Sequence, residues 1–473
     1  MNDFIGREKE LSVLEEFYNN PQIKAYAIIG RRQIGKSALI DEFIKDKENF
    51  KIEFLDSNLD KNLELMGRVM SSVTGIKKEY DSTMDFLWDL AEYIKGHKVV
   101  VVFDEFPYIV KCDESFAAQT QYFIDMQLDD SKLIISGSSI RTMEYETTDY
   151  SRPLYGRTKP LWLHQMSLQE CMEFHKDLSD IDQLKLYMAI GGTPMYHAVP
   201  KFDSFQEYVE KMILGPHALF RTEGEDMIRR EMDHADDIIS MLDSITGRNT
   251  TIKTIVSKTG IDRNACSNYF NALKTLGMIS ENNPMWGSPK IPVQYSISDY
   301  MLSFCYLVKR NDVLNNVDVT DRYKALNSLI STSRGFMFEQ FCMDLITRSY
   351  PVRSIGKWWG SKIEVDEFDN VVLDNDKRPL TTKCDIDIAA EIMVGNNLVN
   401  LAVGCKFKNN PVGFEALNEL DSSIECLKLK RYTRRMIISP SGFTEDLIDY
   451  SIENNILLVG LNMILGKEPM PDI

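Results

Sequence analysis

The sequence predicts an α/β protein with a parallel sheet at its amino end, a helical middle part and a second α/β domain at its carboxyl end. Three observations predict this fold class. A short apolar run at residues 25–29 passes through a glycine loop into a helical pattern. A second apolar run, residues 99–103, ends in two carboxylates. Beyond residue 330, a helix pattern precedes several strand patterns, a helix and a further strand. Because a domain has about 150 residues, a chain of 473 should form about three.

The glycine loop has the spacing of a phosphate-binding loop. Residues 30–37 match G-x-x-x-x-G-K-[ST] at every fixed position. Its glycines let backbone N–H groups face a phosphate, Lys36 reaches the β- and γ-phosphates, and Ser37 ligates Mg²⁺ at the helix N-terminus. We therefore predict ATP and Mg²⁺ as cofactors. The predicted binding residues are Gly30, Arg31, Gln33, Ile34, Gly35, Lys36, Ser37 and Ala38.

The second apolar run reads as a strand buried on both faces, as parallel sheets require. Asp104 and Glu105 follow at its carboxyl end, where ligands bind in open α/β sheets. We predict that Asp104 holds Mg²⁺ together with Ser37, and that Glu105 deprotonates the attacking water as the general base. Lys36 and Glu105 are thus the first two predicted catalytic residues.

Two later segments offer further groups for phosphate chemistry. The strand pattern at residues 132–135 ends in small hydroxyl residues, of which Ser136 or Ser138 could touch the γ-phosphate or its water. The loop at 151–157 carries two arginines, and we predict that Arg157 stabilises transition-state charge, in its own chain or in another. A solvated loop arginine is the alternative.

Composition narrows the class of protein. The net charge of −17 argues against a chain coated in nucleic acid, although a local basic face can be concealed in that sum. Residues 1–8 lack a signal-peptide pattern and no apolar run approaches a membrane span, so we expect a cytoplasmic protein without a membrane partner. Eight cysteines are scattered without C-x-x-C pairs, which predicts buried small hydrophobes rather than zinc ligands or a disulfide framework.

The middle of the chain predicts a DNA-binding module. Helical patterns at residues 238–242, 251–256 and 262–273 precede a hairpin of residues 278–281 and 293–297, the order of a winged helix. Residues 247–292 hold six Lys/Arg and two acids, a local charge of +4. Duplex DNA is the predicted partner, with a protein-docking role or self-association as alternatives. The predicted contacts are Arg263, Asn264, Ser267 and Lys274.

Together these motifs resemble the archaeal-type ATPases, relatives of the AAA and STAND ATPases. The matching segments are residues 4–7, 30–37, 104–108, 136–138, 153–157 and 191–196. The resemblance implies a P-loop NTPase core with a parallel sheet at 1–165, and a helical lid at 166–232 in which Pro194 approaches adenine. It further implies an all-helical or winged-helix domain at 233–310, a linker at 311–329 and a restriction-endonuclease-like domain of the PD-(D/E)xK class at 330–473.

In such nucleases, acidic residues bind Mg²⁺ and a lysine positions water. The resemblance assigns these parts to Glu339, Asp387 and Lys406. The position two before Lys406 is Gly404, where the motif needs an acid, so we expect a degenerate site unless Asp385 or Glu339 compensates.

The resulting functional prediction is an ATP-binding and ATP-hydrolysing switch whose nucleotide state controls binding of DNA or of a partner. Two alternatives stay open. One is a nuclease licensed by ATP, for which Gly404 is the discriminating residue. The other is a scaffold that binds only proteins.

Overall fold

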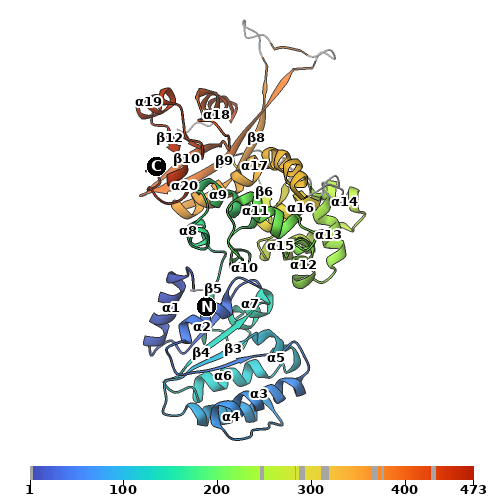
Figure 1. Ribbon diagram of the computed structural model, residues 1–473, viewed down its shortest axis with the longest axis vertical. Helices are drawn as coiled ribbons and strands as arrows, with labels where there is room; N and C mark the ends of the chain where they lie inside the picture. Colours follow the sequence, from blue (N-terminus) through green and yellow to red (C-terminus); the bar gives the residue numbers. More distant parts are fainter. Residues whose placement is uncertain are drawn as a thin grey trace. The chain divides into compact units, whose positions relative to one another are not determined.

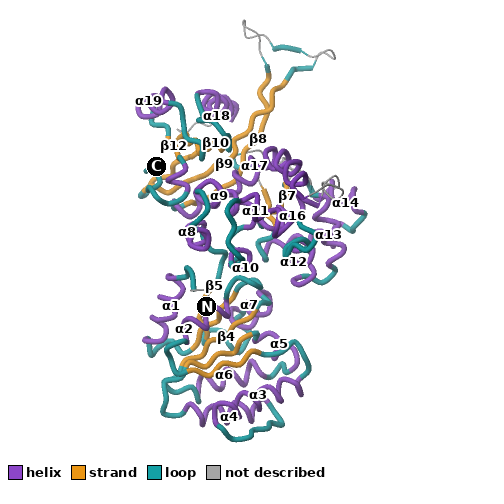
Figure 2. The backbone as a smooth tube through the Cα atoms, in the orientation of Figure 1, coloured by secondary structure: helices purple, strands orange, loops and turns teal. Residues whose placement is uncertain are grey.

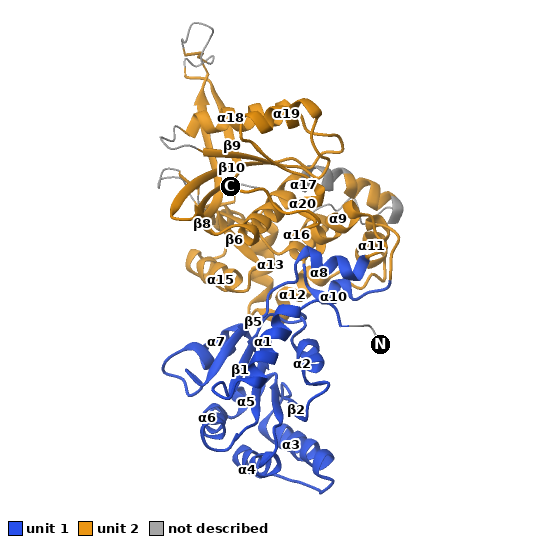
Figure 3. Cartoon of the chain, turned by 90° about the vertical axis from the view of Figure 1, so that its left-hand side faces the viewer, with its two compact units in different colours: residues 1–175, 192–200 blue, residues 176–191, 201–473 orange. Residues whose placement is uncertain are grey.

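The computed structural model describes residues 4–245, 250–282, 284–286, 293–309, 319–364, 371–373, 378–427 and 433–473. The chain forms two compact units, which Figure 3 distinguishes by colour. Unit 1 comprises residues 1–175 and 192–200, and unit 2 comprises residues 176–191 and 201–473. The chain therefore passes between the units at residues 175–176, 191–192 and 200–201.

Unit 1 is built on a parallel sheet (Figure 1). Its strand order is β2-β3-β4-β1-β5. This confirms the sheet predicted for the amino end. β4 lies between β1 and β3, so three loops that follow these strands meet at one edge. The strands are β1 (Ala25–Ile29), β2 (Asn49–Glu53), β3 (Val100–Asp104), β4 (Lys132–Gly137) and β5 (Thr158–Trp162).

Helices cover both faces of this sheet, because alternate side chains of a strand point to opposite sides. Val100 and Val102 share a core with Leu14 and Phe17 of α1. Phe103 instead contacts aromatic rings of α4 and α6, and Figure 2 shows α3, α4 and α6 on the same side of the strands. The helices are α1 (Glu8–Asn19), α2 (Lys36–Ile44), α3 (Leu59–Thr74), α4 (Thr83–Ile94), α5 (Phe106–Cys112), α6 (Phe116–Met126), α7 (Ile140–Thr148), α8 (Leu168–Met172), the 3-10 turn η1 (Glu173–His175) and α10 (Pro194–His197).

The segment predicted as a lid is divided between the units. Residues 166–175 and 192–200 belong to unit 1, and the rest to unit 2. In unit 2 the ring of Tyr187 lies 5.7 Å from that of Tyr300 and 5.9 Å from that of Phe341, which joins α9 to α16 and α17. The helices of this part are α9 (Asp180–Ile190), α11 (Phe205–Val209), the π-helical η2 (Glu210–Leu214), α12 (Glu223–Glu231) and α16 (Tyr300–Lys309).

Three helices and a hairpin follow, as the sequence predicts. Gly260 has φ 73° and ends α14, and the Asp262 side chain caps α15 by accepting from Asn264 N and Ala265 N. That these elements form a winged helix remains a prediction, and residues 287–292 of the hairpin tip lie outside the described residues. The elements are α13 (Ala235–Ser244), α14 (Ile252–Thr259), α15 (Arg263–Thr275), β6 (Ile279–Asn282) and β7 (Gln294–Ile297), the two strands antiparallel.

The carboxyl part of unit 2 is a mixed sheet of order β12-β11-β10-β9-β8 with flanking helices. β8, β9 and β10 pair antiparallel, whereas β10, β11 and β12 pair parallel. This confirms an α/β domain; its endonuclease-like identity remains a prediction. The elements are α17 (Val319–Ser349), β8 (Val352–Ile363), β9 (Thr381–Val394), β10 (Asn397–Cys405), α18 (Phe414–Leu427), β11 (Thr433–Ile438), α19 (Glu445–Glu453), β12 (Leu457–Val459) and α20 (Leu461–Ile464).

Helix α17 starts earlier than the periodicity predicts. It takes in residues 319–329 of the predicted linker, while residues 311–318 lie outside the described residues. Tyr323 and Leu326 are buried, so packing extends the helix toward the amino end from the start expected beyond residue 330. Neither α17 nor any other described helix is long and apolar enough to cross a membrane.

Candidate active site

The loop between β1 and α2 has the backbone that a phosphate-binding loop needs. Gly35 precedes α2 with φ 92°, and Gln33 also has a positive φ of 64°. A Cβ on Gly30 would lie 2.8 Å from the Leu163 carbonyl oxygen, so no larger residue fits there without a shift. The Lys36 side chain is buried, and its Nζ donates to the carbonyl oxygens of Gly30 and Arg31 at 2.9 and 3.0 Å. The loop therefore holds the lysine that is predicted to bind the β- and γ-phosphates.

Asp104 is the centre of a buried hydrogen-bond network. Its side chain is fully buried at the end of β3. Ser37 Oγ donates to Asp104 Oδ2 at 2.8 Å, and Ser136 Oγ donates to Asp104 Oδ1 at 2.5 Å. Strand β4 contributes Ser136 because it lies between the two strands that carry the loop and the carboxylate. The structure therefore brings together the two predicted metal ligands.

Glu105 is tied to the loop that follows β4. It has a left-handed backbone, φ 52°, and its Oε2 accepts hydrogen bonds from Ser138 N at 3.2 Å and Ser138 Oγ at 2.9 Å. Arg32 of the glycine loop donates from Nε to Ser138 Oγ at 3.4 Å and from a terminal nitrogen to Tyr108 Oη at 3.0 Å. The sequence prediction missed Arg32, because the motif fixes no residue type at this position.

Arg7 supports the glycine loop through hydrogen bonds to the backbone, a role that the sequence does not reveal. It is 4% exposed and donates to the carbonyl oxygens of Ile34 at 3.1 Å and His164 at 2.6 Å. Its own N–H donates to Glu170 Oε1 at 3.0 Å. Burial alone would raise the pKa of Glu170, but the bonds from Arg7 and Ser167 outweigh it and lower that pKa. This arginine therefore braces the loop from within.

The predicted lid turn reaches the same loop. A Cβ on Gly35 would lie 3.6 Å from Pro194 Cγ, so Pro194 lies beside the start of α2. The turn itself is tightly packed: Met166 N donates to Gly192 O at 2.8 Å, and a Cβ on Gly192 would lie 1.9 Å from Met166 O. Only glycine fits at 192 in this conformation.

Arg157 lies away from this cluster. It precedes β5, whose first residue Thr158 pairs with Ala25 at the start of β1, whereas the glycine loop follows the end of β1. Its Nε donates to both carboxylate oxygens of Asp125, at 3.1 and 2.8 Å, on the surface. The predicted role within its own chain does not fit this place; a role in a neighbouring chain remains a prediction.

The donors present fit a magnesium nucleotide. A serine hydroxyl and a carboxylate are hard oxygen ligands, which Mg²⁺ prefers. Ser37 and Asp104 already lie within 2.8 Å of each other, and the first N–H groups of α2 follow Gly35. Lys36 supplies a buried positive charge next to them.

The predicted DNA contacts lie on α15. Arg263, Asn264 and Lys274 are exposed, and Ser267 Oγ donates back to the carbonyl oxygen of Arg263 at 3.0 Å. Lys274 forms an ion pair with Glu281 of β6, so its charge is partly neutralised. Arg263 is thus the strongest of these candidates.

The predicted nuclease residues gather around a cavity of about 670 Å³ in unit 2. Asp385, Asp387, Gly404 and Lys406 line it. Burial and the charge of Glu339 raise the pKa of Asp387 to about 6, and its Oδ2 accepts from Cys405 N at 2.8 Å. Glu339 itself is buried and pairs with Lys357 at 2.6 Å.

Two acids of α18 that the sequence did not single out, Glu415 and Glu419, line this cavity. Glu419 of α18 lies 2.5 Å from Lys406 Nζ. Neither acid falls at a position of the nuclease motif, so no sequence pattern pointed to them. Within the described residues, however, no three His, Cys, Asp or Glu side chains come together as a metal-binding group. That the site is degenerate remains a prediction.

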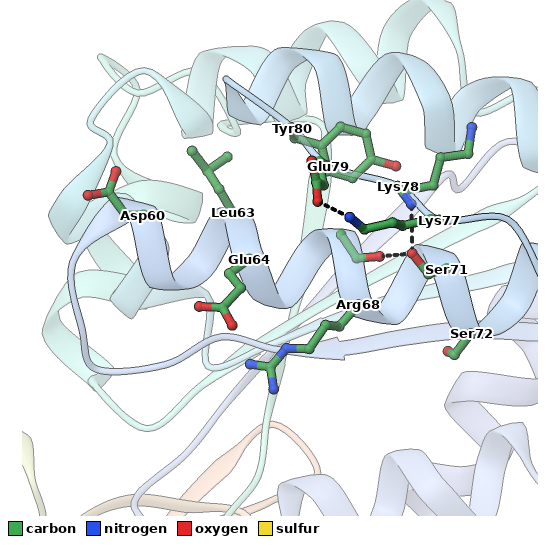
Figure 4. Close-up of a pocket in the computed structure, with 11 residues that line it drawn as sticks. Asp60, Leu63, Glu64, Arg68, Ser71, Ser72, Lys77, Lys78, Glu79 and Tyr80 are labelled. Atoms are coloured by element: carbon green, nitrogen blue, oxygen red, sulfur yellow. Dashed lines mark hydrogen bonds and ion pairs between the residues drawn. The ribbon is translucent and has the colours of Figure 1, made fainter.

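A second cavity, of about 650 Å³, lies between α3 and residues 77–80 (Figure 4). Among its charged groups, Lys77 pairs with Glu79 at 2.6 Å, and Lys78 pairs with Asp89 at 2.8 Å. It contains none of the predicted site residues.

Residues 4–198 match the family model of an ATPase domain found predominantly in Archaea. Residues 4–198 therefore form an archaeal-type ATPase domain. The matched range holds the glycine loop, Asp104, Glu105 and Pro194, and it ends shortly before the third passage of the chain between the units.

Similar proteins occur in archaea. The uncharacterized protein MJECL04 of Methanocaldococcus jannaschii is 25% identical over 393 residues, 80% of this chain and 86% of that protein. The uncharacterized protein MJ0424 of the same organism is 40% identical over 91 residues, 18% of this chain and 86% of that protein. Among solved structures, the Walker-type ATPase PABY2304 of Pyrococcus abyssi covers 64% of this chain and 96% of its own, with 19% identity and a TM-score of 0.48.

Proposed function

We propose that this ATPase is a magnesium-dependent, ATP-hydrolysing switch whose nucleotide state controls binding of duplex DNA or of a protein partner. The observation that carries the proposal is the network at Asp104. Its two carboxylate oxygens hold the hydroxyls of Ser37 and Ser136, and Glu105 follows directly. Such preorganised groups act where charge develops during phosphoryl transfer.

Each residue has a distinct role in this proposal. Lys36 turns from the loop carbonyls to the β- and γ-phosphates, and the N–H groups of α2 complete the phosphate site. Ser37 and Asp104 hold Mg²⁺, which neutralises the charge that develops on the transferred phosphoryl group. Glu105 accepts the proton of the attacking water.

The present contacts of Glu105 suggest how hydrolysis is controlled. Ser138 donates twice to the Glu105 carboxylate, and Ser138 in turn accepts from Arg32. Because Arg32 belongs to the glycine loop, a phosphate bound there would compete for its guanidinium. Glu105 would then exchange its bond from Ser138 for the water.

Pro194 supports coupling to unit 2. It lies beside Gly35, and the chain continues from its turn directly into the second unit on either side, at residues 191–192 and 200–201. A movement of this turn on nucleotide binding would therefore pull on α9 and on the segment before α11. Such a lid converts occupancy into motion.

Steady-state ATP hydrolysis tests the proposal. We expect Mg²⁺-dependent turnover that falls at least about a hundredfold in Lys36→Ala and in Glu105→Gln. Arg157→Ala serves as the matched control, because Arg157 lies at the other end of the sheet; monomeric protein should be unaffected. ATP binding without any turnover in the wild type would reject hydrolysis and leave only a nucleotide-dependent switch.

The DNA branch has its own test on α15. We expect Arg263→Ala to weaken duplex binding and to reduce the slope of log affinity against log salt by roughly 1. Arg221→Ala, an exposed arginine before α12, is the control. If DNA affinity is absent in the wild type, or independent of nucleotide, the partner is a protein and a pull-down with ATP-locked Glu105→Gln becomes the next step.

A second candidate function, metal-dependent cleavage of DNA, rests on the cavity that Asp385, Asp387 and Lys406 share. Nicking of a supercoiled plasmid in Mn²⁺ that Asp387→Ala abolishes would support it. Because Gly404 supplies no acid, we expect no nicking by the wild type.

A further inference from the structure

Two cysteines that are 42 positions apart in the sequence meet in unit 2. Cys384 of β9 and Cys426 of α18 have their Sγ atoms 2.7 Å apart. This distance is far shorter than an ordinary non-bonded contact: two carbon atoms, which are smaller than sulfur, have their most favourable separation at about 3.5–4.0 Å. The distance exceeds an S–S bond of about 2.05 Å by only about 0.7 Å, so the two sulfur atoms lie close to bonding distance.

The two thiols differ in their access to solvent. Cys384 is buried and belongs to the core under α18, whereas Cys426 is half-buried at its edge. A small reagent can therefore reach Cys426 first, with Cys384 waiting behind it. This is the arrangement of an attacking thiol and a resolving thiol.

We propose that Cys384 and Cys426 are the site of an intramolecular disulfide, formed by exchange with a low-molecular-weight disulfide such as oxidised glutathione. The Cys426 thiolate attacks one sulfur of the small disulfide, which forms a mixed disulfide and releases one small thiolate. The Cys384 thiolate then attacks Cys426 Sγ, which forms the Cys384–Cys426 bond and releases the second small thiolate. Each cysteine loses one proton, and the small disulfide takes up the two electrons.

The bond would act on the cavity that holds Asp385. Cys384 lines this cavity next to Asp385, and α18 contributes Glu415 and Glu419 to its wall. A disulfide between Cys384 and Cys426 would therefore link α18 to β9 and fix the distance between these two elements on either side of the cavity. Reduction would release the helix end.

A second pair of cysteines provides an internal control. Cys342 and Cys405 also contact each other, but both are buried. Small disulfides reach them only after local unfolding. Selective oxidation of the first pair is therefore expected from access alone.

The pH dependence of the exchange follows from the surroundings of Cys426. Burial and the hydrogen bond with Cys384 raise the pKa of Cys426 to about 11. The charge of Glu425 also raises this pKa, whereas the charge of Lys362 lowers it. The thiolate is the reactive form. We expect the rate of oxidation to rise about tenfold per pH unit between pH 7 and 9.

The test uses the full chain, reduced, freed of reductant and incubated with oxidised glutathione. The free thiols are then alkylated in denaturant, and the protein is digested without reductant. Mass spectrometry should detect a peptide pair linked through Cys384 and Cys426, and the number of alkylated cysteines should fall from eight to six. In Cys384→Ser, the expected product is a glutathione adduct on Cys426. Cys342→Ser should leave the link unchanged.

Two results would overturn the proposal. One is a stable glutathione adduct on Cys426 in the wild type without the linked peptide. The other is oxidation that involves Cys342 or Cys405 at an equal rate. The thermal unfolding transition of unit 2 in each variant, measured by calorimetry, serves as the check of folding, because all four cysteines belong to this unit.

Discussion

The carboxylates Asp104 and Asp387 both end or interrupt apolar strands, yet their surroundings differ. Asp104 receives hydroxyl groups from the glycine loop and from strand β4. Asp387 accepts a backbone N–H from Cys405, and the adjacent strand β10 offers only Gly404 toward the same cavity. The neighbouring strand therefore decides whether a buried acid receives a side-chain hydroxyl group from it, as Asp104 does from β4, or none, as at Gly404. Four predictions test this comparison.

The largest expected effect is the loss of hydrolysis in Asp104→Asn. The amide keeps the size of the side chain but removes the charge that holds Mg²⁺, so turnover should fall about a hundredfold or more. Asp387→Asn, the matched change in unit 2, should leave turnover unchanged. Phosphate release at saturating ATP measures both. Equal losses in the two variants would show that the units act as one catalytic site.

Two glycines extend the comparison to packing. Gly192→Ala should destabilise the protein by about 3 kcal/mol, because its Cβ would meet the Met166 carbonyl oxygen at 1.9 Å. A Cβ on Gly404 meets nothing within 4 Å, so Gly404→Ala should be neutral or stabilising by up to about 1 kcal/mol. Urea unfolding with equal m-values measures the difference. A stable Gly192→Ala variant would mean that the lid turn can rearrange.

Lowering the pH should decrease the stability of unit 1 and increase that of unit 2. Burial lowers the pKa of His175 in unit 1 to about 4. An unfolded histidine titrates near pH 6.5, so the unfolded state binds more protons and stability is lost as pH falls from about 6.5 to 4, by about 2 kcal/mol at pH 5. The raised pKa of Asp387 works the other way: the cost of its buried charge is fully present above about pH 6 and disappears as pH falls.

Calorimetry at pH 7 and pH 5 measures this contrast. From pH 7 to pH 5, the unfolding temperature of unit 1 should fall and that of unit 2 should rise. In His175→Gln the downward shift should shrink, since glutamine does not titrate. Parallel shifts of both transitions would contradict the assignment of the two groups.

The smallest expected effect is a gain in unit 2. Gly404→Glu places a carboxylate where the nuclease motif needs one, in open space next to Asp387 and Lys406. We expect affinity for Mn²⁺ to rise about tenfold, which corresponds to about 1.4 kcal/mol. Gly404→Gln has the same length without the charge and should show no gain. Isothermal titration calorimetry distinguishes the two variants.

Much of the ATPase site could be predicted because its parts are local in sequence. The glycine loop, Lys36 and Ser37 form one contiguous motif, and Asp104 with Glu105 ends one apolar strand. The loop needs positive φ at Gly35, and a parallel strand needs apolar side chains on both faces, so each requirement leaves a mark on neighbouring residues.

The partners that hold these groups could not be predicted in the same way. Arg32 and Ser138 meet across 106 positions, and Arg7 reaches His164 across 157. Arginine and serine are common surface residues, so neither type nor spacing signals the contact. Arg157 shows the opposite case, a motif residue that the strand register places at the far end of the sheet.

The sequence by itself determined the α/β class, the phosphate loop, the carboxylates of β3 and the gap at Gly404, because each depends on the chemistry of adjacent residues. Only the tertiary structure decided that β4 lies between β1 and β3 and brings Ser136 to Asp104, that the predicted lid is shared by two units, and that Cys384 meets Cys426. Strand order and helix packing depend on the burial of distant apolar faces against each other, and that choice is made by the whole chain.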